Sequence, residues 1–346
     1  MKKYLLPNTG KYYKANLHAH TTLSDGSLTP EEVKELYKSQ GYSILAYTDH
    51  GVFIPHNDLT DETFVALNGF EGEMNENTFD HLFVSEKCVH LCFIAKEKDI
   101  VKHPFWHRSD YLFGNAINNR HLVQFDETQP DYVREYSGKG ICDMIKRGRD
   151  NGFFVTYNHP KWSQENFEQY GKYEGMNAME IYNHGSWVEG FNEYNGDDYD
   201  NLLRQGKRIY CIATDDNHNH APLGDPKCDV CGGFVMINAD KLDYPSVIKS
   251  LENGHFYASR GPIISQLYYD TEEKKLYVQC SPAKKIIITT AMRIARILTA
   301  EARGEEYLQE ATFNVSGKEG YIRLTIYDEK GLTADTNAYF IDELLK

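Results

Sequence analysis

The sequence predicts an α/β protein, in which an irregular (β/α) barrel is followed by a small antiparallel β domain. Up to about residue 262, short apolar runs typical of strands alternate with amphipathic segments typical of helices. Histidines and acids follow many of these apolar runs. Beyond Gly261-Pro262 the pattern changes to short strands separated by turns such as Ser316-Gly317. We therefore expect two domains, 1–262 and 263–346.

Composition limits the classes of partner. The chain has 346 residues, of which 41% are hydrophobic and 25% charged, with a formal net charge of -14. This acidity argues against a long nucleic acid, which needs clustered basic residues, but allows a small phosphorylated substrate whose charge metal ions balance. We find no apolar run of about 20 residues, which predicts no membrane span. Residues 1–7 lack the apolar stretch of a signal peptide.

The cysteines suggest a compartment but not a function. Seven cysteines are scattered along the chain, which suits a reducing environment better than a disulfide framework. We therefore expect the protein to be cytoplasmic. Cys228 and Cys231 form a single C-x-x-C without a second pair, so we interpret them as structural or incidental rather than as a zinc or redox site.

The first strand–helix–strand unit is clearly marked. Residues 14–17 predict a short strand. Thr29 is a natural N-cap with Pro30 at the first helical position, Glu32 completes a capping box, and the helix ends near Gly41. Residues 42–47 predict a buried parallel strand. Ligands gather at the carboxyl ends of such strands.

The same pattern continues along the chain. The predicted strands of the barrel cover 64–70, 89–95, 153–157, 177–182, 208–213 and 234–237, and the predicted helices cover 141–149, 198–205 and 244–252. A polar, aromatic-rich insertion at about 103–138 is either a lid or binding loop, or a structural excursion. In the C-terminal domain we expect strands at 276–278, 286–288, 311–315, 321–327 and 338–341, and no metal, because it has no histidine.

Imidazoles and carboxylates accompany the predicted barrel strands in large number. In a strand, residues i and i+2 point to the same face, so His18 and His20 would project side by side. Such ligands suit divalent Zn, Mn or Fe, and bridging carboxylates hold two or three ions at the spacing used for phosphoryl displacement. The full set of predicted metal ligands is His18, His20, Asp25, His50, Glu71, His90, His159, Asp216 and His218.

The order of these motifs resembles the PHP (polymerase and histidinol phosphatase) superfamily over roughly residues 14–262. The matching motifs are His18-Ala19-His20 with Ser24-Asp25-Gly26, Thr48-Asp49-His50, Gly69-Phe70-Glu71, Asn158-His159-Pro160 and Asp216-Asn217-His218. The resemblance implies a distorted (β/α)7 barrel, similar to a TIM barrel, with up to three metal ions. It implies a first ion held by His18, His20, Glu71 and Asp216, a second held by Glu71, His90 and His159, and a third held by Asp25, His50 and His218.

Three assignments have alternatives. The histidine after the Gly-x-Glu motif is His90, which lies in an apolar strand, or His81. The Asp-x-His spacing selects Asp216, while Asp215 orients a ligand instead. Glu73 is the alternative to Glu71.

Other polar residues are candidates for catalysis or substrate binding. The predicted catalytic residues are Asp216, His184 and Asp215, and His184 or Asp215 would protonate the leaving alkoxide. For both His184 and His220, the alternative is a solvated or supporting role. Lys161 and Arg260 would contact phosphate. The alternative for Lys161 is an ordinary surface lysine, and the alternative for Arg260 is an interdomain salt bridge. Arg108 and Arg120 on the insertion are weaker candidates.

These observations predict a metal-dependent phosphoesterase. A metal-activated water would attack the phosphorus of a small phosphorylated metabolite or nucleotide in a di- or trinuclear site. The alternatives are an amidohydrolase-type metal-dependent hydrolase and a metal-stabilised, non-catalytic binding or regulatory module.

Overall fold

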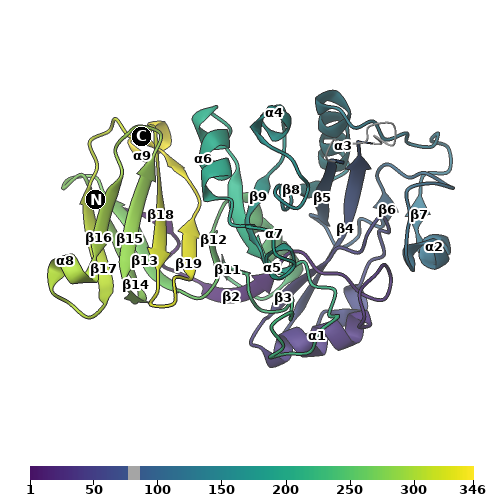
Figure 1. Cartoon of the computed structure of the whole chain (residues 1–346), viewed down its shortest axis with the longest axis horizontal. Helices are drawn as coiled ribbons and strands as arrows, with labels where there is room; N and C mark the ends of the chain where they lie inside the picture. The colour runs from purple at the N-terminus through teal and green to yellow at the C-terminus, as the bar shows by residue number, and fades with distance from the viewer. Residues whose placement is uncertain (77–85) are drawn as a thin grey trace.

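The computed structural model describes residues 1–76 and 86–346. It shows a mixed α/β fold with one large sheet, one smaller sheet and, in the insertion, a two-stranded sheet (Figure 1). The C-terminal strands, coloured green to yellow, lie at one end of the long axis, and the insertion lies at the other. None of the helices in the described residues combines the length and apolar character that a membrane span requires.

The first half of the large sheet carries the predicted barrel strands, in the spatial order β10-β9-β8-β5-β4-β3-β2-β11. Pairing is parallel within β2–β3–β4 and β8–β9–β10, and antiparallel at β4–β5, β5–β8 and β2–β11. The strands are β2 (Lys11–Asn16), β3 (Ile44–Tyr47), β4 (Val65–Asn75), β5 (Cys88–Ala95), β8 (Phe153–Tyr157), β9 (Ala178–Asn183), β10 (Tyr210–Thr214) and β11 (Phe234–Ala239).

This topology confirms the mixed α/β class, but it does not show a closed barrel. Among the described residues the sheet does not close into a ring, and three of its neighbouring pairs are antiparallel. The physical reason is that β4 and β5 are buried almost throughout, and a strand buried on both faces has the same apolar sequence in either direction.

The longer helices begin and end close to the predicted positions. Helix α1 (Pro30–Ser39) has the predicted capping box, with Thr29 and Glu32 reciprocally bonded. Three more helices lie near the expected ranges: α3 (Gly138–Asp150), α6 (Gly196–Arg204) and α7 (Tyr244–Glu252). The short helical turns are η1 (Asn57–Leu59), α2 (Ala116–Asn119), η2 (Arg120–Leu122), α4 (Phe167–Tyr170), α5 (His184–Val188), α8 (Ala300–Arg303) and α9 (Ile341–Leu344).

The C-terminal strands are antiparallel, as expected. The large sheet continues through β12 (Phe256–Ser259), β19 (Thr333–Thr336), β18 (Tyr321–Tyr327), β15 (Lys285–Thr290) and β16 (Arg296–Thr299), with β20 (Tyr339–Phe340) beside β18. The smaller sheet has the order β1 (Lys2–Leu6), β13 (Ile264–Asp270), β14 (Lys275–Ala283) and β17 (Leu308–Asn314). The N-terminal strand β1 therefore pairs with the C-terminal part of the chain, and its residue Leu6 lies in the core of that part.

The insertion has its own small core. It includes β6 (Lys102–His103) and β7 (Gln124–Phe125), and buries Trp106 and Val123. Arg108 pairs with Asp131, and Arg120 donates hydrogen bonds to the carbonyls of 107–109. These two arginines, which were weaker substrate candidates, hold the insertion together.

Candidate metal centre

His18 and His20 follow β2 and point to the same place. Their Nε2 atoms lie 3.1 Å apart, and both side chains are fully buried. Oδ1 of Asp216, just beyond β10, lies 3.1 Å from Nε2 of His18 and 2.9 Å from Nε2 of His20. The expectation that the two histidines project side by side is met.

Glu71 lies at the centre of the cluster, and its two carboxylate oxygens face different histidines. Oε1 lies 3.2 Å from His18 Nε2, 3.2 Å from His90 Nδ1 and 3.5 Å from His159 Nε2. Oε2 lies 3.2 Å from His50 Nδ1 and 3.5 Å from His20 Nε2. A carboxylate that presents its two oxygens in this way is suited to bridging two ions.

Asp25 and His218 form the more open side of the cluster. Asp25 Oδ2 lies 3.5 Å from His218 Nε2 and 3.6 Å from His50 Nε2, and its Oδ1 lies 3.8 Å from His20 Nδ1. The side chains of Asp25 and His218 are 29% and 24% exposed, whereas that of Glu71 is fully buried. A ligand from solvent would therefore approach from this side.

The structure thus brings together all the predicted ligand residues, and the grouping differs slightly from the one that the resemblance implies. Ligand atoms within 4.8 Å of one another define four groups, three of which consist entirely of predicted ligands, and His159, 3.5 Å from Glu71, belongs to none of the four. His20 belongs to two of the three, and His50 joins Glu71 and His90 in the third. These three groups are His18, His20, Glu71 and Asp216; His20, Asp25, His50 and His218; and His50, Glu71 and His90.

Unpartnered buried atoms show that these residues fit metal ions. His20 Nδ1, His50 Nδ1, Glu71 Oε2 and Asp216 Oδ1 are buried, and although other cluster atoms lie within 3.8 Å of each, none of the described residues meets them in hydrogen-bonding geometry. Such orphaned atoms are costly unless something else binds them. A tetrahedral ion with ligands at about 2.1 Å places its ligand atoms roughly 3.4 Å apart, and the separations given above lie close to this value.

The charges of the cluster oppose one another. Burial alone raises the pKa of a carboxyl, but the surrounding imidazoles hold the pKa of Glu71 and of Asp216 well below its usual range. Burial alone lowers the pKa of a histidine, but Asp216 and the neighbouring negative charges raise the pKa of His18 well above its ordinary value. The metal-free cluster therefore favours ionised acids beside a protonated His18, whereas burial and the neighbouring His20 lower the pKa of His50 well below its ordinary value.

The backbone at the site is tightly defined. Isolated parallel bridges join Ala19 to Asn217 and His50 to Glu71, so the segments after β2 and β10 are held together and the segment after β3 is held beside β4. Asp216 has a φ of 52°, in the left-handed region that few residues other than glycine adopt. Such strain is found at functional sites, where the surrounding structure fixes it.

Glu180, a fully buried acid within β9, was not among the predicted site residues. Its Oε1 accepts from His18 Nδ1 at 2.7 Å and from Thr214 Oγ1 at 2.6 Å, and its Oε2 accepts from the backbone N–H of His159 at 2.9 Å. The bond to Nδ1 fixes the His18 tautomer and leaves Nε2 to face the cluster. The available signal was an acid in the middle of an otherwise apolar strand.

Asp49 has a comparable supporting position that the motif alone did not indicate. Its carboxylate accepts from the Thr21 backbone N–H at 2.8 Å and from Ser24 Oγ at 2.7 Å. It therefore fixes the loop that links His20 to Asp25.

The residues considered as alternative ligands, His81, Glu73 and Asp215, have different positions relative to the cluster. His81 lies in 77–85, outside the described residues. Glu73 lies on the other side of His90, where it forms a further potential metal group with Cys88. Asp215 accepts from the N–H groups of residues 231–233 and from the Tyr37 hydroxyl, and burial raises its pKa to about 7. Asp215 thus fixes a loop, and its roles as an orienting residue or proton donor stay predictions.

The remaining catalytic and phosphate candidates have other partners. His184 Nδ1 lies 2.8 Å from the Tyr182 hydroxyl. Lys161 pairs with Asp198 at 2.6 Å. The Arg260 guanidinium lies 4.0 Å from the centre of the Tyr182 ring, and no described acid pairs with it. Their roles with substrate stay predictions.

PHP-like phosphoesterases are among the similar solved structures. A two-domain protein of Bacteroides vulgatus containing a predicted PHP-like metal-dependent phosphoesterase has a TM-score of 0.43 and 13% identity, with 98% of this chain and 97% of that chain covered. A Bifidobacterium adolescentis protein named as a metal-dependent phosphoesterase has a TM-score of 0.36 and 15% identity, covering 64% and 92%. An amidohydrolase from Chromobacterium violaceum has a TM-score of 0.36 and 16% identity, covering 62% and 93%. No protein-family model and no curated protein matches the chain.

Proposed function

We propose that this protein hydrolyses a phosphate ester of a small metabolite or nucleotide with two or three divalent ions as cofactors. The observation that supports the proposal is the convergence of buried histidines and acids around Glu71. Their ligand atoms are nitrogen and oxygen, which suit Zn, Mn or Fe. When bound, such ions supply a water of lowered pKa and positive charge for the phosphoryl oxygens.

The side chains of this protein would bind and orient the reacting groups. Glu71 would be shared between ions through its two oxygens, because each oxygen faces different histidines. Glu180 would keep His18 in the tautomer that presents Nε2. The substrate would enter beside Asp25 and His218, the most exposed side chains of the cluster.

We also propose that the site is built on a distorted (β/α)7 barrel. The bridge between Ala19 and Asn217 supports this, because it joins the segments after β2 and β10, the first strand and the last parallel strand of this part of the chain. The His20 N–H donates to Asn217 O at 3.0 Å, and the Asp216 N–H donates to His18 O at 3.0 Å.

Replacement of single ligands tests the function. His18→Ala and Asp216→Ala should abolish hydrolysis of p-nitrophenyl phosphate after metal removal and replenishment, and should lower the metal content measured by mass spectrometry. His121→Ala is the matched control, because His121 is an exposed histidine whose Nδ1 lies 2.9 Å from the Asn118 carbonyl oxygen and which belongs to none of the potential metal groups. Wild-type activity in the two ligand variants would contradict the proposal.

A substrate panel separates the alternative functions. Hydrolysis of carboxamides, with none of phosphate esters, would favour an amidohydrolase. A tightly metallated protein that is inert on both would favour the binding or regulatory module.

A further inference from the structure

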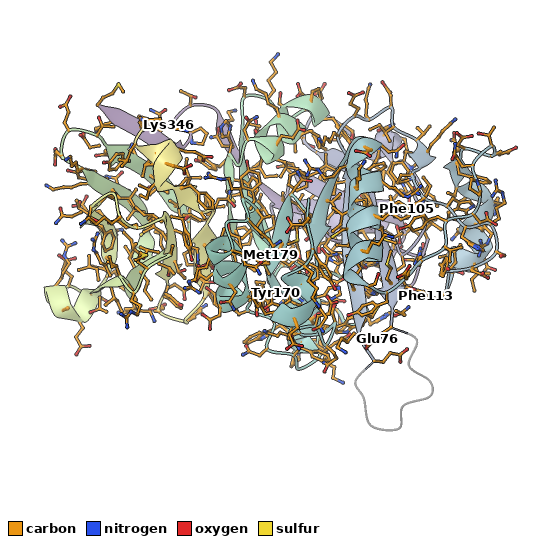
Figure 2. All side chains as sticks on the ribbon, turned by 90° about the horizontal axis from the view of Figure 1, so that it is seen from above. Glu76, Phe105, Phe113, Tyr170, Met179 and Lys346 are labelled. Carbon is orange, nitrogen blue, oxygen red and sulfur yellow. The ribbon has the colours of Figure 1, made fainter. Side chains whose placement is uncertain are left out.

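Two aromatic rings lie against different histidines of the metal cluster. The Phe113 ring centre lies 4.7 Å from that of His50, and the Trp162 ring centre lies 4.9 Å from that of His90. The His50 and His90 centres are 5.4 Å apart, so Phe113, His50, His90 and Trp162 are successive ring neighbours. Phe113 comes from the insertion, where Figure 2 labels it, and Trp162 comes from the loop after β8.

Core packing does not account for these rings. Phe113 is 37% exposed, Trp162 is half-buried, and neither belongs to a hydrophobic core of the described residues. Within 1–76 and 86–346, the aromatic neighbours of the two rings are histidines of the cluster: His50 for Phe113, and His90 and His159 for Trp162.

Both rings are held in place by polar contacts of their own segments. The Trp162 indole Nε1 donates to Glu189 at 3.1 Å, and its backbone N–H donates to buried Glu193 at 2.9 Å. Beside Phe113, the Asn115 N–H donates to Ser24 O at 2.8 Å, which ties the insertion to the loop of Asp25. The aromatic faces are therefore pre-organised, which lowers the entropic cost of binding a flat ligand.

Two basic side chains of the segments that carry the rings have partners within the protein. Lys161, next to Trp162, pairs with Asp198, and Arg134 donates to the Glu73 carbonyl at 2.7 Å. The rim therefore offers aromatic faces rather than free charge to the organic part of a substrate.

We propose that Phe113 and Trp162 form a stacking rim that selects phosphate esters whose alcohol part carries a flat aromatic group. This inference rests on the proposed phosphoesterase function and names its substrate class. Stacking on an exposed aromatic side chain depends on the face of the ligand ring and little on the polar groups at its edge. The rim would therefore recognise a flat shape rather than one particular ring.

A pair of stable probes tests the rim without turnover. Phenylphosphonate and methylphosphonate share the anionic group and differ in the ring, and their P–C bond is not an ester. Calorimetry on the metal-replenished protein should show phenylphosphonate binding about tenfold more tightly. Phe113→Ala or Trp162→Ala should reduce that ratio severalfold while methylphosphonate binding stays unchanged.

Phe167→Ala is the matched control, because Phe167 is 40% exposed on α4 and its ring neighbour is Tyr170. It should leave the ratio unchanged. Phe113→Leu and Trp162→Leu keep apolar bulk without an aromatic face, and replace the alanine variants if those fail to fold.

The outcomes distinguish this inference from the function. Equal binding of the two phosphonates, or an unchanged ratio in both rim variants, overturns the rim while hydrolysis of phosphate esters still stands. A uniform loss of both probes in the variants makes the rings structural and also overturns it. If neither probe binds and no phosphate ester is hydrolysed, the proposed function itself fails.

Discussion

The two ring nitrogens of His18 have different partners, and this difference determines which of them can bind a metal ion. His18 uses Nδ1 for Glu180 and turns Nε2 toward Glu71 and Asp216. A neutral imidazole has one donor and one acceptor nitrogen, so the ionised partner at Nδ1 determines which nitrogen is free to bind a cation. Glu180 therefore acts on a metal ion through His18.

Glu180→Gln should weaken metal binding by roughly 10- to 100-fold without unfolding the protein, because the amide keeps the shape but loses the charge that orients His18. Competition with a fluorescent chelator measures the affinity. Glu174→Gln is the control, since Glu174 is an exposed residue that pairs with Lys207. Equal metal affinities in the two variants would contradict the orienting role.

The raised histidine pKa values predict that metal uptake releases protons. Burial lowers the pKa of a histidine, but Glu71 and Cys88 raise that of His90 above its ordinary value, and Asp25 and Asp216 raise that of His218 to about 9. At pH 7 His218 is therefore protonated without metal, and a ligand nitrogen must lose its proton to bind a cation. Calorimetry in buffers of different ionisation enthalpy should detect the release. Binding with no proton release at pH 7 would be inconsistent with these charges.

The same shift sets the pH dependence of stability. A raised pKa contributes stability that is fully present below the unfolded value, about 6.5 for histidine, and is lost as the pH rises through the folded value. For His218 this window runs from about 6.5 to about 9. The metal-free protein should therefore lose stability across this window, as urea unfolding at several pH values would show. Constant stability there would exclude a contribution from His218.

At the scale of elements, the cap of α1 has a measurable share in stability. Thr29 accepts from the Glu32 backbone N–H, and the Glu32 carboxylate accepts from the Thr29 N–H. Thr29→Ala should lower the free energy of unfolding by about 1 kcal/mol while metal content stays unchanged. Denaturant unfolding measures the first and mass spectrometry the second. Loss of metal together with stability would show instead that α1 is coupled to the site.

Local signals explain which elements could be predicted. A cap and an apolar stripe lie within a few residues, so α1 was predicted at its observed start. The direction of β5 and the partner of β1 depend on residues far along the chain, and the apolar pattern is the same for either arrangement. The closed parallel barrel was therefore the part of the fold that the sequence could not decide.

The site residues likewise include some that local motifs predict and some that only the fold brings together. Histidine and acid motifs mark ligand positions locally, and the structure brings these residues together. Lys161 pairs with Asp198, and Arg260 lies over the Tyr182 ring; both contacts join residues that are distant in the sequence. Glu180 lies in a buried strand, and its role depends on a hydrogen bond with His18, which is far away in the sequence. Spacing predicts ligands, whereas the partners that orient them come only from the fold.

At the scale of the molecule, one buried arginine joins the C-terminal strands to the part that carries the site. Arg323 of β18 donates to Asp200 of α6 at 2.8 and 2.7 Å, and to Asp335 of β19 at 3.2 Å. Asp335 also accepts from the Tyr194 hydroxyl at 3.0 Å. The residue before Tyr194, buried Glu193, accepts the backbone N–H groups of residues 161 and 162.

Arg323→Met should therefore destabilise the whole protein, because it leaves the buried Asp200 and Asp335 without their charge partner. Removing one member of a buried ion network costs about 3–5 kcal/mol. Arg208→Met is the matched control, since Arg208 pairs with Asp342 and Glu343 at the surface and should change little. Thermal unfolding should show one cooperative transition at a lower temperature for Arg323→Met. If that variant instead melts in two steps, or no earlier than Arg208→Met, the C-terminal strands are not stabilised together with the part of the chain that carries the metal cluster.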